Sequence, residues 1–213
     1  MENEKYLQDL SEIKQMMHRS SRFISLSGLS GVFAGFYAIL GAIIAKILIS
    51  RNRFNYEDFS AFSEKNLNND LIFQLLLLAL VVLILAIGTA VFLTTRKAKK
   101  NKQKIWDSTT RRLVINFFTP LAAGGIFCLV LLEYSLIGFI APCMLLFYGL
   151  ALIHASKYTL GELRSLGYAN LVLGLIATQF MGYGLYFWAL GFGVFHIIYG
   201  IWMYNKHDRK SAL

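Results

Sequence analysis

Apolar and polar residues follow one another along the chain in blocks, and five long blocks contain no charged side chain. These blocks cover residues 23–45, 71–95, 113–132, 134–156 and 165–205. About 20 apolar residues in a helix cross roughly 30 Å of hydrocarbon, so each of the first four blocks predicts one transmembrane helix and the last predicts two. We therefore expect an all-α polytopic membrane protein with six transmembrane helices arranged as three helical hairpins.

The expected spans divide the chain into three parts. Helices are predicted at residues 23–48, 71–95, 113–132, 134–156, 165–182 and 185–205. Together they form a membrane domain over 22–205, which follows a cytosolic amphipathic tail at 1–21 and precedes a cytosolic C-terminal tail at 206–213. The composition also indicates a membrane protein. Of the 213 residues, 56% are hydrophobic and only 15% are charged, so the chain is more apolar and less charged than a typical water-soluble domain.

The positions of the cations predict how the chain is oriented in the membrane. If the N-terminus is cytoplasmic, 17 Lys and Arg residues lie on the inner side, and only Lys46, Arg51, Arg53 and Lys65 lie outside. Lys and Arg next to a span resist translocation, so the cytoplasmic segments hold the excess. Because the number of spans is even, both termini are expected in the cytoplasm.

Two segments on the inner side are candidates for binding partners. The basic loop 96–112 holds eight Lys and Arg residues, and we interpret it as a contact with anionic lipid rather than with nucleic acid. In the N-terminal tail, Tyr6, Leu10, Ile13 and Met17 recur at helical spacing and form an amphipathic stripe. This stripe predicts contact with the membrane surface, with a cytosolic protein partner, or with a second copy of the chain in a homo-oligomer.

Small residues indicate the faces on which membrane helices pack closely. In the first span Ser27, Gly31 and Gly35 share one face, and in the sixth span Gly193 and Gly200 share another. We expect span one to press on a neighbouring helix of the same chain, with a second copy as the alternative. The fifth span carries a similar stripe, and we expect the stripes of spans five and six to face each other. The stripe of span five consists of Gly167, Asn170, Gly174 and Thr178.

One ionisable side chain is predicted deep in the membrane. His196 lies ten positions before the next charged residue, about 15 Å from the inner boundary by helical rise. Tyr148 and Gly174 are expected at a similar depth, and with Thr178 and Gln179 they complete a candidate polar core or ligand-binding site. In the alternative interpretation, a neutral His196 is hydrogen-bonded to Tyr148, Thr178 or a backbone carbonyl and only stabilises helix association.

Other kinds of chemistry have no supporting pattern in this sequence. No Asp, Glu, Lys or Arg lies deep in a predicted span, which disfavours a proton-coupled carrier. No nucleotide-binding motif and no pair of catalytic carboxylates occurs. Cys128 and Cys143 are interpreted as small apolar fillers, because a metal site would need further ligands. We therefore expect no catalytic residue, no metal site, no cofactor and no enzymatic activity.

Two stretches of the chain resemble a known family. They are residues 22–35 (RFISLSGLSGVFAG) and 189–204 (ALGFGVFHIIYGIWMY). On these stretches, and over most of its length, the chain resembles a family of small multi-span integral membrane proteins of Bacteroidota. The resemblance implies a bacterial inner-membrane location, and it assigns no activity and no site residues.

Two hypotheses of function follow from the sequence. In the leading hypothesis the protein is a non-enzymatic membrane scaffold or a regulatory or interaction component. In the alternative it is a small permease or binder for an apolar or weakly polar molecule. The two differ in the interior of the bundle, because the permease requires an accessible pocket at His196 and the scaffold does not.

Overall fold

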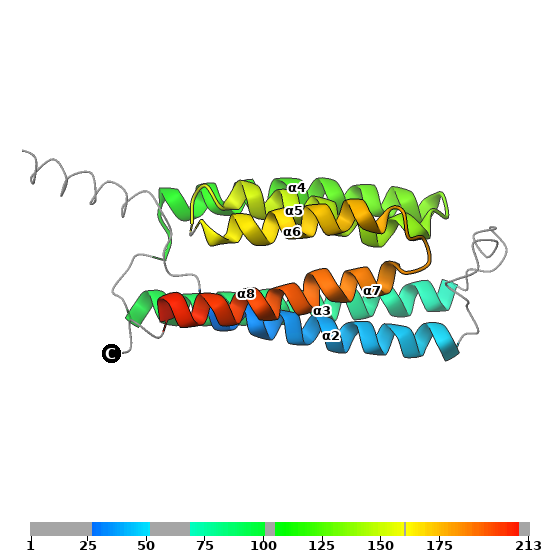
Figure 1. Ribbon diagram of the computed structural model, residues 1–213, viewed down its shortest axis with the longest axis horizontal. Helices are drawn as coiled ribbons and strands as arrows, with labels where there is room; N and C mark the ends of the chain where they lie inside the picture. The colour runs from blue at the N-terminus through cyan, green and yellow to red at the C-terminus, as the bar shows by residue number, and fades with distance from the viewer. Residues whose placement is uncertain (1–26, 52–68, 101–104, 160, 209–213) are drawn as a thin grey trace, which may run out of the picture.

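The computed structural model describes residues 27–51, 69–100, 105–159 and 161–208. Within these ranges the chain is helical apart from its turns, and six helical segments run along a common axis (Figure 1). The first five are α2 (Gly28–Arg51), α3 (Asn69–Lys100), α4 (Ser108–Glu133), α5 (Ile140–Ala155) and α6 (Glu162–Ala177), and a short 3-10 turn, η2 (Ile137–Phe139), precedes α5. The predicted N-terminal tail at 1–21 lies outside the described residues.

The sixth segment is built from four consecutive pieces, which we call together the C-terminal helix. They are α7 (Gly184–Trp188), η3 (Ala189–Val194), α8 (Phe195–Met203) and η4 (Tyr204–Asp208). Both η3 and η4 are π-helical, so the chain is locally wider than an α-helix at two places. Short π-helical stretches inside α-helices occur often at functional sites.

Five of the six segments are long and apolar enough to cross a membrane: Gly28–Arg51, Asn69–Lys100, Ser108–Glu133, Ile137–Ala155 and Gly184–Lys206. Their outward side chains are largely apolar, and on α3 the side chains of Leu80 and Phe92 are 51% and 63% exposed. Continuous apolar surface of this kind is stable in hydrocarbon and unstable in water. The chain is therefore a polytopic membrane protein, and the predicted all-α class is confirmed.

The fifth segment is shorter than its sequence predicts. The predicted span was 165–182, whereas α6 has 16 residues and ends at Ala177. The chain then turns through 178–183, where Gly182 has a φ of 94°, a conformation that glycine adopts without strain. Apolar residues continue past Ala177 into this turn, so hydropathy does not show where the helix ends.

The segment expected to be a basic loop is in part helical. Helix α3 continues through Arg96 to Lys100, and cations in the last turn of a helix are stabilised by the partial negative charge of its carbonyl groups. Helix α4 then begins at Ser108, before the predicted residue 113. Its N-cap is Asp107, whose carboxylate accepts a hydrogen bond of 2.7 Å from the backbone N–H of Thr110.

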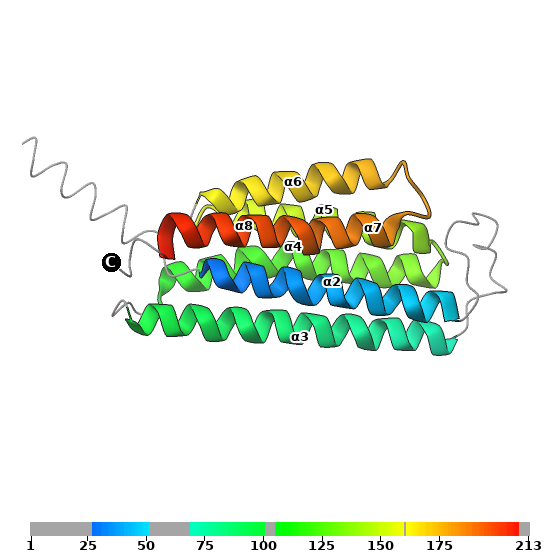
Figure 2. The same ribbon diagram turned by 60° about the horizontal axis from the view of Figure 1, so that its bottom comes forward.

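The six segments form two layers of three (Figure 1), and a turned view separates their members (Figure 2). In one layer α2 packs between α3 and the C-terminal helix, and in the other α5 packs between α4 and α6. The C-terminal helix also contacts α5 and α6, so it joins the two layers. The third predicted hairpin is not a main packing unit, since α6 packs chiefly on α5 and the C-terminal helix chiefly on α2.

Candidate functional site

One side of the C-terminal helix packs on α2 through glycine. A Cβ atom added to Gly200 would lie 2.6 Å from the backbone nitrogen of Val32 and 2.7 Å from the carbonyl oxygen of Gly28. A Cβ added to Gly35 would lie 2.5 Å from the carbonyl oxygen of Gly193. The two backbones are therefore in direct contact, an approach that only residues without a side chain allow.

The remaining small residues expected at this face lie close by. A Cβ added to Gly31 would lie 3.2 Å from the Cα of Gly200 and 3.3 Å from the carbonyl oxygen of His196. Ser27 is buried just before the first residue of α2, and its carbonyl oxygen accepts a hydrogen bond of 2.6 Å from the hydroxyl of Ser30. Span one thus presses on span six of the same chain.

The stripe of the fifth span faces a different helix from the one we expected. A Cβ added to Gly167 would lie 2.9 Å from the carbonyl oxygen of Gly149, and one added to Gly174 would lie 3.0 Å from the backbone nitrogen of Leu146. Both contacts are on α5. The glycines of the stripes of spans five and six therefore pack on α5 and on α2 and not on each other, which differs from the expected pairing.

The opposite side of the C-terminal helix carries a hydrogen-bonded histidine. His196 is 7% exposed, and its Nδ1 lies 2.9 Å from the carbonyl oxygen of Gly191. Because a carbonyl only accepts, Nδ1 carries the hydrogen. Its Nε2 lies 2.6 Å from the hydroxyl of Tyr148 on α5, and in the neutral imidazole Nε2 accepts that hydroxyl's hydrogen. Both ring nitrogens of His196 are thus occupied by groups of the protein.

The π-helical segment η3 positions this histidine. Gly191 lies within η3, five residues before His196, and the wider turn leaves its carbonyl beside the imidazole ring. Aromatic rings enclose the pair: the ring centroids of Tyr148 and Phe192 are 4.9 Å apart, and those of Tyr148 and Phe117 are 6.1 Å apart. The pair therefore joins the two helix layers at the centre of an apolar interface.

The structure brings Tyr148 to His196 but not the other three candidate residues. Gly174 packs against α5. The hydroxyl of Thr178 donates to the carbonyl of Leu175 at 2.7 Å, beyond the last residue of α6. The amide of Gln179 donates to the Thr178 hydroxyl at 3.2 Å, and the Gln179 side chain is exposed. These three residues belong to the packing and the end of α6.

Asn170 is a buried polar residue that we did not include in the candidate site. It is 0% exposed, and its Nδ2 donates to the carbonyl of Leu166 at 3.0 Å. Its Oδ1 faces the C-terminal helix, since a Cβ added to Gly191 would lie 2.7 Å from it. The sequence does indicate that Asn170 is buried, because this residue lies in the small-residue stripe of span five, which packs against neighbouring helices.

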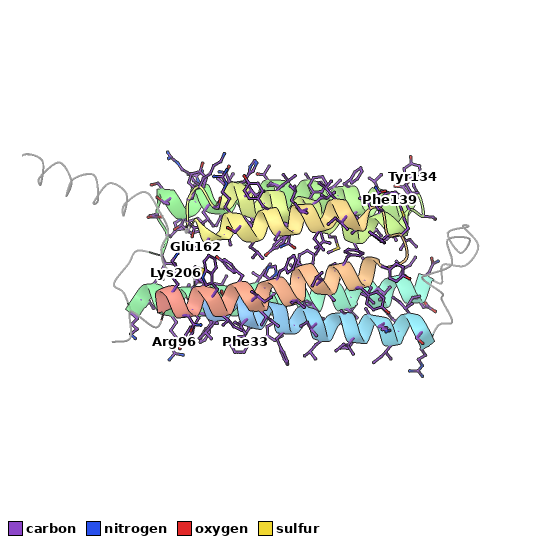
Figure 3. The ribbon with its side chains drawn as sticks, in the orientation of Figure 1. Phe33, Arg96, Tyr134, Phe139, Glu162 and Lys206 are labelled. Atoms are coloured by element: carbon purple, nitrogen blue, oxygen red, sulfur yellow. The ribbon has the colours of Figure 1, made fainter. Side chains whose placement is uncertain are left out.

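Most charged residues of the described chain lie at one end of the bundle. Figure 1 shows the C-terminal ends of α3, α5 and the C-terminal helix beside the N-terminal ends of α4 and α6. Figure 3 labels Arg96, Glu162 and Lys206 at this end, and Tyr134 and Phe139 at the other. We call this region the cationic end, and its described cations are Arg96, Lys97, Lys99, Lys100, Arg111, Arg112, Lys157, Arg164 and Lys206.

An ion pair links two helices at the cationic end. The Nζ of Lys206 lies 2.6 Å from Oε1 of Glu162 in the first turn of α6. Near the opposite end, the Nζ of Lys46 on α2 lies 5.2 Å from the centroid of the Tyr186 ring, a cation–π contact. The C-terminal helix is therefore attached to α6 at one end and to α2 at the other. In the described part of the chain, no group of three His, Cys, Asp or Glu residues is placed to hold a metal ion.

Comparisons with protein-family models, curated proteins and solved structures gave no match to this chain. The class of the protein accordingly rests on the five long apolar helices and on the pattern of the sequence.

Proposed function

We propose that the protein is a non-enzymatic scaffold or regulatory component of the bacterial inner membrane, with both termini in the cytoplasm. The observation that supports this most is the concentration of cations at one end of the bundle. Cations next to a span resist translocation, and the first residue of α2 and the last of the C-terminal helix both lie at this end (Figure 1). The resemblance of residues 22–35 and 189–204 supports the bacterial location.

In this proposal the cationic end binds anionic lipid headgroups. Each Lys or Arg near such a surface contributes about 1 kcal/mol, so several of them fix the bundle firmly at one depth. The amphipathic tail at 1–21 would lie on the same face, where a cytosolic protein or a second copy of the chain can bind it. Nucleic acid is not needed to account for the charge.

The contacts of the interior favour the scaffold over a permease. A permease built on His196 needs the candidate residues around one accessible site. Instead, both ring nitrogens of His196 are engaged, and Thr178 and Gln179 lie beyond the end of α6.

Reporter fusions test the topology on which the proposal depends. A fluorescent protein that folds only in the cytoplasm is fused after Leu213, and in a control it is inserted into the α4–α5 turn at Ser135. We expect fluorescence from the first fusion and none from the second. Fluorescence from the turn insertion alone would reverse the orientation and remove the proposed cytoplasmic face.

A crosslinking experiment tests the interaction role. The full-length chain is crosslinked in native membranes and purified beside a chain that lacks residues 1–18. A chain that lacks residues 209–213 is the matched control, because it also loses a charged terminal segment. We expect a crosslinked product, to a partner or to a second copy, in the full-length chain and the control only. Its absence from the full-length chain would count against the scaffold.

A further inference from the structure

Two buried polar atoms beside the His196–Tyr148 pair have no hydrogen-bond partner in the described protein. They are Oη of Tyr199, whose residue is 8% exposed, and Oδ1 of Asn170, whose residue is 0% exposed. Tyr199 follows His196 by one helical turn, and Asn170 faces Gly191, whose carbonyl binds His196. A buried polar atom without a partner is costly, so two of them flanking one network indicate a further hydrogen-bonding species.

Tyr199 lies beside the His196–Tyr148 pair in a cluster of packed side chains. The buried members of this cluster are Leu152, Ala155, Leu163, Leu166, Tyr199 and Met203, and Tyr148 packs against it. The cluster belongs to α5, α6 and the C-terminal helix, so the unpaired Tyr199 hydroxyl lies at the interface that also holds the pair.

The chemistry of these groups selects the species that fits between them. A hydroxyl has one donor and two acceptor positions. The Tyr148 hydroxyl donates its hydrogen to Nε2 of His196, so only its acceptor positions are left. Asn170 Oδ1 only accepts, whereas Tyr199 Oη can do both. The partner must therefore donate to some groups and accept from others, and it must be small enough for a tightly packed helix interface. Water meets these requirements, and buried water commonly satisfies such groups.

We propose that bound water molecules occupy this interface beside Tyr199 and Asn170 and form hydrogen bonds with their unpaired oxygen atoms. An apolar cluster that includes Leu145, Leu173 and Phe187 adjoins the site. The interface is therefore a buried water-binding site beside the Tyr148–His196 pair.

Hydroxyl-radical footprinting of the full-length chain in lipid nanodiscs tests this site. Radicals form from water in place, so a buried side chain is oxidised when a water molecule touches it. We expect Tyr199 and Tyr148 to be oxidised several-fold faster than Phe187, an aromatic control in the apolar cluster. Equal rates for the three side chains would overturn the proposal.

The stability of a Tyr199→Phe variant gives an independent test, because its sign differs between a wet and a dry interface. If water binds the hydroxyl, its removal leaves a water molecule without a partner and lowers the midpoint of thermal unfolding by several degrees. If the hydroxyl is dry and unpaired, its removal raises the midpoint and contradicts the proposal. Tyr186→Phe, at a half-exposed ring on the same helix, is the control for loss of a hydroxyl.

Discussion

The two sides of the C-terminal helix meet their neighbours by opposite means. Toward α2 the contact is made by backbone atoms, because glycines on both helices remove the side chains. Toward α5 and α6 it is made by large side chains, in which His196 and Tyr148 share a hydrogen bond inside an aromatic layer. The first side has no room for an added atom, whereas the second depends on particular polar atoms. Substitutions that add volume should therefore act on the first side, and substitutions that remove polar groups on the second.

The largest effect is expected from adding one methyl group at the glycine face. In Gly200→Ala the new Cβ would meet the backbone of Val32 and Gly28, which cannot move without separating the helices. We expect a loss of about 3 kcal/mol in the free energy of unfolding, measured by denaturant titration in detergent micelles.

Gly88→Ala is the matched control for this substitution. Gly88 also lies within a long helix, α3, and a Cβ added there would meet nothing within 4 Å. Since alanine favours a helix over glycine by about 1 kcal/mol, the control should be neutral or slightly stabilising. Equal losses at both positions would show that the close contact between α2 and the C-terminal helix does not determine stability.

A smaller effect is expected at the polar side, where a double-mutant cycle isolates the hydrogen bond. His196→Ala and Tyr148→Phe each remove one partner, and the double variant removes both. We expect a coupling free energy of about 0.6 to 2 kcal/mol from the stability of the four proteins, the range found for hydrogen bonds between membrane helices. Strictly additive losses would mean that the 2.6 Å contact contributes nothing beyond packing.

The smallest effect is expected at the ion pair of the cationic end. Lys206 is 49% exposed and Glu162 is 16% exposed, so water screens much of their attraction. Lys206→Gln should lower the free energy of unfolding by at most about 1 kcal/mol, and the loss should shrink in high salt. A salt-independent loss of the size expected for Gly200→Ala would place this pair among the main supports of the bundle.

Much of the fold follows from the sequence because hydrocarbon forms no hydrogen bonds with the backbone and excludes charged side chains. Charge-free runs give the number of helices and their approximate positions, since a spanning chain has to satisfy its backbone within each helix. Helical rise counted from the charged residues also predicts Tyr148 at the depth of His196, and the two are in contact in the structure. Depth can be counted along a helix from its charged ends, so residues at equal depth can be proposed as neighbours.

The lateral arrangement of the helices does not follow from the same reasoning. A stripe of small residues shows that a helix is closely packed but not on which neighbour, and the glycines of spans five and six pack on α5 and α2 rather than on each other. Depth alone also fails at the end of α6, because Thr178 and Gln179 lie in or near a turn that hydropathy does not reveal. The importance of Asn170 depends on its approach to Gly191, a contact between residues far apart in the sequence.

The unequal lengths of the edge helices have a consequence for the surrounding lipid. Helix α3 has 32 residues and α6 has 16, which correspond to about 48 Å and 24 Å of helical rise. A bilayer core of roughly 30 Å is shorter than α3 and longer than α6, and α6 is not among the five segments that are long and apolar enough to span it. In a membrane we therefore expect the lipids next to α6 to adjust most to the protein.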